Sequence, residues 1–167
     1  MKFARITLSD RASAGIYADL SGPAIEEFFA AQLADEIEWE RVLIPDESDR
    51  ISAELRRLSD VCGCALIVTT GGTGPSPRDV TPEATRAVLE RELPGFGEIM
   101  RVQSFATVPT SILSRATAGT RGRTLILNLP GNPRAIGECL PLLLPAIIEC
   151  LAHLGWPRPR RAGLAAE

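Results

Sequence analysis

The feature that most constrains the fold is a run of mostly apolar residues at 65–69, ALIVT, which the glycine-rich sequence TGGTG follows at once. A continuous run of this kind is typical of a strand that is covered on both faces. Residues 124–128, TLILN, form a second buried-strand pattern, which the turn sequence PGNP closes shortly afterwards. Strands buried on both faces need helices on both sides of their sheet. The chain is therefore predicted to be an α/β protein with a mostly parallel sheet.

Strand and helix patterns alternate along the rest of the chain, as a parallel sheet requires. Two further strands are predicted at residues 3–8 and 40–44. Helices are predicted to begin at Ser21 or Gly22, at Ser48 and at Thr81, and to cover residues 98–105 and 134–154.

Three regions carry more specific expectations. The helix that is predicted to begin at Thr81 is expected to end near Arg91. Pro141 and Pro145 lie inside the last helical pattern and predict a break or kink near Leu140, because proline removes a helical hydrogen bond. Residues 107–118 show no clear pattern and could hold a short antiparallel excursion of the sheet.

Length and composition indicate a single soluble domain. The 167 residues are 45% hydrophobic and 23% charged, which excludes disorder over the whole length. Residues 1–155 form the predicted domain, and residues 156–167, rich in Pro, Arg, Gly and Ala, are predicted to be a flexible C-terminal tail. No stretch approaches the roughly 18 uncharged apolar residues of a membrane helix, and the first residues resemble a strand rather than a signal peptide. We therefore expect a cytoplasmic protein with no membrane partner.

Charge and motif content exclude two further classes. Lysine and arginine number 18 against 21 aspartates and glutamates, a net charge of −3, and the basic residues are mostly scattered. A nucleic-acid partner is not expected, because such proteins present a dense basic face. Lys2 is the only lysine, so the lysine-containing phosphate loop of P-loop nucleotide enzymes is absent.

The four cysteines and the single histidine favour structural roles over chemical ones. Two disulfides or a zinc site are alternatives for the cysteines, but the CGC sequence at 62–64 has the wrong spacing for a zinc knuckle, and Cys139 and Cys150 sit in a helical apolar pattern. Buried thiols are the preferred interpretation. His153 would have to be the base of any Ser-His-Asp or Cys-His hydrolase, and its place in an amphipathic pattern favours a helix-end residue instead.

Four loops are expected to hold the site. Ligands of open α/β sheets bind beyond the carboxyl ends of the strands. The segments that follow the predicted strands hold nearly all the grouped Gly, Ser, Thr and Asp residues, and they lie at 9–15, 45–47, 70–82 and 129–133.

The loop after the third strand is the most informative. Glycines allow backbone N–H groups to approach an anion closely, and threonine hydroxyls add donors. A helix start at Thr81 and the neighbouring Arg78 favour a phosphate or polar-ligand site over the alternative, a tight turn without chemistry. The predicted binding residues of this loop are Thr70, Gly71, Gly72, Thr73, Gly74 and Arg78.

Two aspartates form a candidate metal site. Asp46 and Asp79 lie in loops at the same predicted sheet edge, beside the glycine loop. A pair of carboxylates together with phosphate oxygens suits Mg²⁺. The alternative for Asp46 is a turn residue, which the preceding Pro45 favours.

Six ordered motifs resemble those of the molybdopterin adenylyltransferases of the MogA type, which share their fold with MoaB proteins and the gephyrin G domain. The motifs are SDRASAGIY, IPDE, TTGGTG, RDVTPEAT, PGFGE and NLPGNP, and the resemblance runs from Ile6 to about Leu154. It implies a three-layer α/β/α sandwich, usually a homotrimer, that binds molybdopterin and ATP. The implied reaction transfers AMP to the terminal phosphate of molybdopterin, releases pyrophosphate and belongs to molybdenum cofactor synthesis, whose other proteins are possible partners.

The resemblance also implies roles for individual residues. Asp46 and Asp79 match the acidic positions tied to catalysis and Mg²⁺, and Ser13 and Gly15 lie in a loop that the family uses near its site. Asn132 and the pair Ser114-Arg115 match looser motifs.

Two departures from the family pattern qualify the match. The chain is shorter than several catalytic members, which leaves its trimer contacts open. Some MoaB-type relatives lack the RDVTP sequence, which is intact here and favours the active enzyme. The alternative is a non-catalytic molybdopterin-binding or scaffold module, and the metal inserted downstream could be molybdenum or tungsten.

Overall fold

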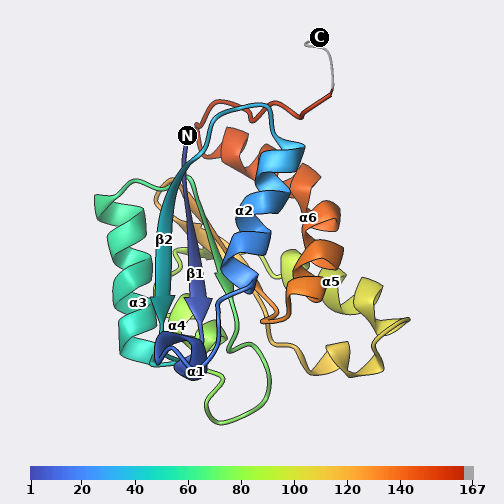
Figure 1. Cartoon of the computed structure of the whole chain (residues 1–167). Coiled ribbons are helices and arrows are strands. Elements are labelled where there is room, and N and C mark those ends of the chain that lie inside the picture. The colour runs from blue at the N-terminus through green and yellow to red at the C-terminus, as the bar shows by residue number, and fades with distance from the viewer. Residues whose placement is uncertain (164–167) are drawn as a thin grey trace.

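The computed structural model describes residues 1–163 and is built on one six-stranded sheet (Figure 1). The strand order is β2-β1-β3-β6-β5-β4. The strands β2, β1, β3 and β6 are parallel to one another, whereas β5 pairs antiparallel with β6, and β4 pairs antiparallel with β5. The mostly parallel sheet predicted from the sequence is confirmed. The strands are β1 (Lys2–Leu8), β2 (Glu38–Ile44), β3 (Leu66–Thr70), β4 (Arg91–Glu92), β5 (Ala118–Arg121) and β6 (Thr124–Leu129).

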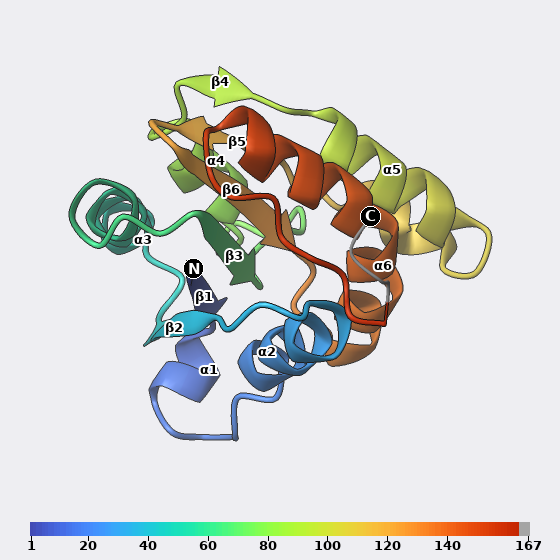
Figure 2. The same cartoon turned by 90° about the horizontal axis from the view of Figure 1, so that it is seen from above.

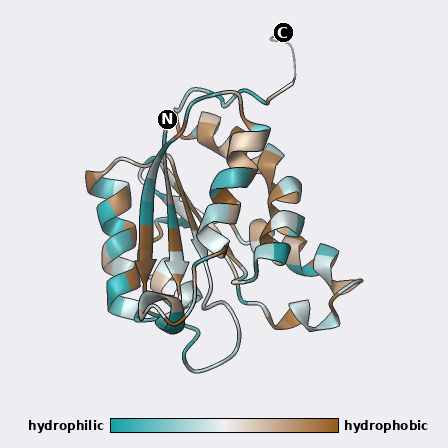
Figure 3. Ribbon diagram, viewed as in Figure 1, coloured by the Kyte–Doolittle hydropathy of each residue, from teal (hydrophilic) through white to brown (hydrophobic). Residues whose placement is uncertain are grey.

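Helices cover both faces of this sheet, which completes the predicted three layers (Figure 2). On one face Leu55 and Ala84 pack against Ile6, and on the other Phe29 and Leu143 belong to a separate apolar cluster. Figure 3 shows brown, hydrophobic residues gathered on the strands and along α6. The first face is formed by α3 (Ser48–Arg56), the π-helical turn η1 (Arg57–Val61) and α4 (Thr81–Arg86), and the second by α2 (Ser21–Gln32), α5 (Gly95–Phe105) and α6 (Pro133–His153).

The chain after α4 differs from the sequence-based expectation. The helix that begins at Thr81 ends at Arg86 instead of near Arg91. The following residues leave the helix because they pair with β5: the N–H of Glu90 donates to the carbonyl of Thr120 at 2.8 Å. Tertiary strand pairing therefore overrides the local helical pattern. Residues 107–118 hold mainly the 3₁₀ turn η2 (Pro109–Leu113), and the antiparallel excursion begins only at their last residue.

Of the break or kink predicted near Leu140, the break is wrong, because α6 is one continuous helix of 21 residues. A kink at this position stays a prediction. Pro141 and Pro145 lie on its exposed side, where carbonyls that lose a helical partner can bond to water. Leu140, Leu143 and their neighbours pack into the core and hold the helix together. By length and composition α6 could also cross a membrane, a test that buried core helices of soluble proteins pass as well.

The segment after α6 runs back along the molecule and contacts residues near the end of α2. The Arg160 guanidinium lies 2.8 Å from a carboxylate oxygen of Asp35, and the N–H of Ala162 donates to the carbonyl of Gln32 at 2.9 Å. The indole N–H of Trp156 donates to the carbonyl of Arg123 at 2.7 Å. Flexibility of the 156–167 tail stays a prediction, and its residues 164–167 lie outside the described part of the chain.

The cysteines and the histidine lie in ordinary structural surroundings. Cys64 and Cys139 are buried, Cys62 and Cys150 are partly buried, and all four are free thiols. Burial raises the pKa of Cys64 to about 12, which keeps this thiol protonated at neutral pH. His153 is the last residue of α6 and is exposed beside Glu149.

Candidate active site

The four loops predicted to form a site meet at the carboxyl ends of the parallel strands, at the lower end of the view in Figure 1. The hydroxyl of Thr70 donates to the carbonyl of Pro130 at 2.7 Å, which joins the loops after β3 and β6. The N–H of Asp10 donates to Asp46 at 3.1 Å, which joins the loops after β1 and β2. The structure therefore brings together residues from all four loops.

Gly72 lies where the loop after β3 passes against Asp46. Its φ is +61°, a conformation that residues other than glycine rarely adopt. A Cβ at this position would lie 2.7 Å from Oδ1 of Asp46 and would also crowd the Oγ1 atom of Thr81. The neighbouring Gly71 uses its N–H to donate to the carbonyl of Leu129. Within the predicted phosphate-binding loop, the N–H of Gly71 is therefore already used in a hydrogen bond that belongs to the fold.

Asp46 is the most unusual carboxylate of the site. Its Oδ2 atom accepts the N–H of Asp10, whereas Oδ1 is buried and has no hydrogen-bond partner. Burial raises the pKa of Asp46 above its usual value, and the negative charges of Asp10 and Asp79 raise it further. A buried carboxylate oxygen without a partner is costly, and a cation would supply the missing charge.

Asp79 lies close enough to Asp46 for its charge to act on that residue, and it is held by its own loop. Its Oδ2 atom accepts the N–H of Ser76 at 3.0 Å. A Cβ added to Gly74 would lie 2.9 Å from the same oxygen, so glycine leaves room for this carboxylate. No group of three or more His, Cys, Asp or Glu side chains gathers for a metal within residues 1–163. The two carboxylates of Asp46 and Asp79 fit Mg²⁺, a cation that is commonly held by one or two carboxylates together with phosphate oxygens and water.

Arg78 is engaged by a residue that sequence reasoning did not single out. Its Nη2 and Nε atoms donate to the Asp10 carboxylate at 2.7 and 3.0 Å. This guanidinium holds the pKa of Asp10 below its usual range. The side chain of Arg78 is 62% exposed, so it can exchange this partner for a phosphate. Asp10 belongs to the SDRASAGIY motif, but no local sequence pattern indicates which arginine it pairs with.

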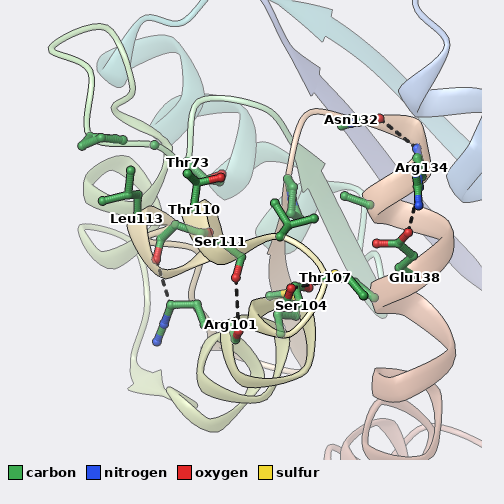
Figure 4. Close-up of a pocket in the computed structure, with 18 residues that line it drawn as sticks. Thr73, Arg101, Ser104, Thr107, Thr110, Ser111, Leu113, Asn132, Arg134 and Glu138 are labelled. Carbon is green, nitrogen blue, oxygen red and sulfur yellow. Dashed lines mark hydrogen bonds and ion pairs between the residues drawn. The ribbon is translucent and has the colours of Figure 1, made fainter.

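Two cavities flank the loop after β3. The larger has a volume of about 560 Å³ and the smaller about 310 Å³, and both lie within the size range of small-molecule sites. Gly71 lines the smaller cavity and Thr73 lines the larger, so the segment carrying Gly72 separates them. Figure 4 shows side chains from three directions around the larger cavity, namely Thr73 from the loop, Ser104 and Ser111 from α5 and η2, and Asn132 and Arg134 from the start of α6.

Of the remaining predicted binding residues, Asn132 lines a cavity, whereas Ser13 and Gly15 do not. Asn132 lines the larger cavity, but its side-chain oxygen caps α6 by accepting the N–H of Arg134 at 3.0 Å. Ser13 and Gly15 lie in and after the short helix α1 (Asp10–Ser13) and line neither cavity. Tyr17 also lines the smaller cavity, although the sequence indicated this residue only as part of the SDRASAGIY motif. Binding roles for these residues stay predictions.

Comparison with known proteins assigns the family. The model of the probable molybdopterin binding domain matches residues 4–149. Molybdopterin adenylyltransferases from Helicobacter pylori J99 and Escherichia coli K12 are each 51% identical to the chain; the matches cover 87% and 84% of it, and 83% and 72% of those proteins. The chain belongs to the molybdopterin adenylyltransferase family.

Solved structures of the family share the fold. The MoaB protein of Thermus thermophilus superposes with a TM-score of 0.86 at 43% identity, over 94% of this chain and 98% of its own. The Mog protein of Mycobacterium ulcerans gives a TM-score of 0.85 at 35% identity, over 92% and 98%. Family membership thus confirms the resemblance drawn from the six motifs, and the fold predicted with it.

Proposed function

We propose that this chain transfers AMP from ATP to the terminal phosphate of molybdopterin in molybdenum cofactor biosynthesis. A phosphate oxygen of molybdopterin attacks the α-phosphorus of ATP, and the bond to the β-phosphate breaks to release pyrophosphate. The observation that carries the proposal is the buried, unpartnered Oδ1 atom of Asp46 beside Asp79, at the loop that divides the two cavities. This arrangement suits two substrates that meet at a charge-neutralising centre.

The reaction needs positioning more than acid–base chemistry, because the substrate phosphate is itself the nucleophile. His153 lies at the opposite end of α6 from Asn132, about 30 Å away for a helix of this length. A histidine base at the site is therefore not part of the proposal. Arg78, once released from Asp10, would neutralise part of the phosphate charge.

Mg²⁺ is the cation that we propose for Asp46 and Asp79. These two carboxylates would hold the ion together with phosphate oxygens, and the ion would offset the negative charge of the transferring group. The support is the buried Oδ1 atom of Asp46, which has no hydrogen-bond partner, together with the pKa of this residue. Burial raises that pKa, and the negative charges of Asp10 and Asp79 raise it further.

We propose that the protein is cytoplasmic and assembles as a homotrimer. Phe29, Leu143 and Ile147 are buried in the core of the single chain and supply no surface for association. The support comes from α5 and η2, where Val102 and Ile112 are exposed beside one another. Other proteins of cofactor synthesis remain proposed partners.

A binding and turnover assay with molybdopterin, ATP and Mg²⁺ tests the proposed function. The proposal predicts pyrophosphate release that depends on molybdopterin and on the metal, together with formation of adenylylated molybdopterin. Binding of molybdopterin without any release of pyrophosphate would contradict it and would favour the non-catalytic, MoaB-like scaffold.

A further inference from the structure

Arg115 contacts the loop that carries Asp79 through both its side chain and its backbone. It follows η2, and its side chain is 36% exposed. Its Nε atom donates to the carbonyl of Gly74 at 2.9 Å, and Nη2 donates to the carbonyl of Asp79 at 2.6 Å. Its backbone N–H donates to the carbonyl of Thr73 at 2.8 Å. The remaining guanidinium nitrogen, Nη1, pairs with the Glu83 carboxylate.

These contacts tie together the two ends of one loop. Gly74 and Asp79 are five positions apart, and the residues between them are exposed. Within the loop, a turn joins the N–H of Asp79 to the carbonyl of Ser76 at 2.9 Å, but this turn does not fix the loop to the body of the protein. Arg115 does so from outside. The guanidinium presents its N–H groups in a fixed planar fork, so the two carbonyls that it binds are set relative to each other.

We infer that Arg115 is a positioning residue that places the Asp79 carboxylate for AMP transfer. The inference rests on the proposed function of Asp79 and adds the group that holds it. Asp79 must stay within reach of Asp46 and the phosphates, and a displacement of about 1 Å at a reacting centre can lower a rate on the order of 10²-fold. Arg115 contacts the backbone carbonyls of the loop and not the carboxylates of Asp46 or Asp79, so its effect on the reaction passes through the position of Asp79.

Kinetics of variants give the first test. In Arg115→Ala we expect kcat to fall by about 10- to 100-fold, with a smaller change in KM for either substrate. Arg115→Lys keeps the charge opposite Glu83 but loses the fork, so its kcat should also fall, and it serves if the alanine variant folds poorly. Arg121→Ala is the matched control, because Arg121 also bridges a carbonyl and a carboxylate but at Val88 and Asp60, outside the site. Its kcat should match that of the unaltered protein.

A measurement independent of activity follows the loop itself. Arg78 is an exposed trypsin site within the loop, so the rate of cleavage of the Arg78–Asp79 bond reports how firmly the loop is held. We expect this rate, followed by mass spectrometry, to rise several-fold in Arg115→Ala and to stay unchanged in Arg121→Ala. An unchanged rate together with a raised KM and normal kcat would make Arg115 a substrate contact and overturn the inference.

A double-mutant cycle separates the inference from the proposed function. If Arg115 acts through Asp79, adding Arg115→Ala to Asp79→Asn should lower kcat little beyond Asp79→Asn alone. Losses that multiply would overturn the positioning role while leaving the function of Asp79 intact. Absence of turnover in the unaltered protein would instead defeat the proposed function, and the cleavage rates would still decide whether Arg115 holds the loop.

Discussion

At the scale of single residues, burial of the Asp46 carboxylate lowers the stability of the fold, while the same carboxylate has a proposed role in catalysis. Its raised pKa means that the folded protein carries an ionised, partly buried carboxylate at a cost once the pH exceeds that pKa. Protonation removes this cost as the pH falls toward the usual value of 3.8. Asn is neutral at every pH. We therefore expect Asp46→Asn to be more stable at neutral pH on the order of 1 kcal/mol, or about 2 to 4 °C in Tm, while turnover is lost.

Thermal unfolding of both proteins between neutral and acidic pH, without Mg²⁺, measures this difference. It should shrink as the pH falls, and adding Mg²⁺ should raise the Tm of the unaltered protein more than that of the variant. A variant that is less stable at neutral pH would show that the Asp46 carboxylate stabilises the fold and that its burial has no cost to explain.

At the scale of elements, the loop between β3 and α4 is the one whose shape matters most for the site. In Gly72→Val the new side chain would displace Asp46 and Thr81 and would face a φ of +61°. We expect loss of phosphate binding, and of turnover by about 10²-fold or more, with the sheet still folded by circular dichroism. Gly122→Ala is the control, because Gly122 also has a positive φ but open space around it. Unchanged ligand affinity in Gly72→Val would mean that the loop is only a turn.

Elements also show where sequence reasoning succeeded and where it stopped. The strands at 65–69 and 124–128 could be predicted because burial on both faces leaves a continuous apolar run. The end of α4 at Arg86 could not, because pairing with β5 is decided by residues about thirty positions away. The continuity of α6 through Pro141 depends on packing of its buried face, which the local proline rule does not include.

The same division holds within the site. Motifs and strand ends placed Asp46 and Asp79 at one sheet edge, because loops after parallel strands must meet there. The side chains that hold these loops in place could not be predicted from the sequence in the same way. The bond between Arg78 and Asp10 joins residues 68 positions apart, and the contacts of Arg115 with Gly74 and Asp79 span 41 and 36.

At the scale of the whole molecule, we propose that a second copy of the chain covers the exposed apolar residues of α5 and η2. Val102 is 66% exposed and Phe105 50%, and they lie beside Ile112. In Val102→Glu we expect association to weaken by at least about tenfold, because a charge would be buried in the interface. Val61→Glu, at an 80% exposed position on η1, is the matched control. Light scattering at micromolar concentration measures both, and a stable monomer of the unaltered protein would contradict the homotrimer.

Asp46 and Asp79 are proposed to hold together the metal that neutralises charge during AMP transfer. The most direct test is the turnover of Asp79→Asn, Asp46→Asn and the double variant at several Mg²⁺ concentrations, with molybdopterin affinity measured separately. Each single variant should lose turnover on the order of 10²-fold or more, with a much smaller loss of pterin affinity. The double variant should lose less than the product of the two, because both carboxylates serve one metal–phosphate unit. Near-normal turnover in Asp79→Asn, or equal loss of pterin affinity and turnover, would contradict a metal-holding role of the two carboxylates in AMP transfer.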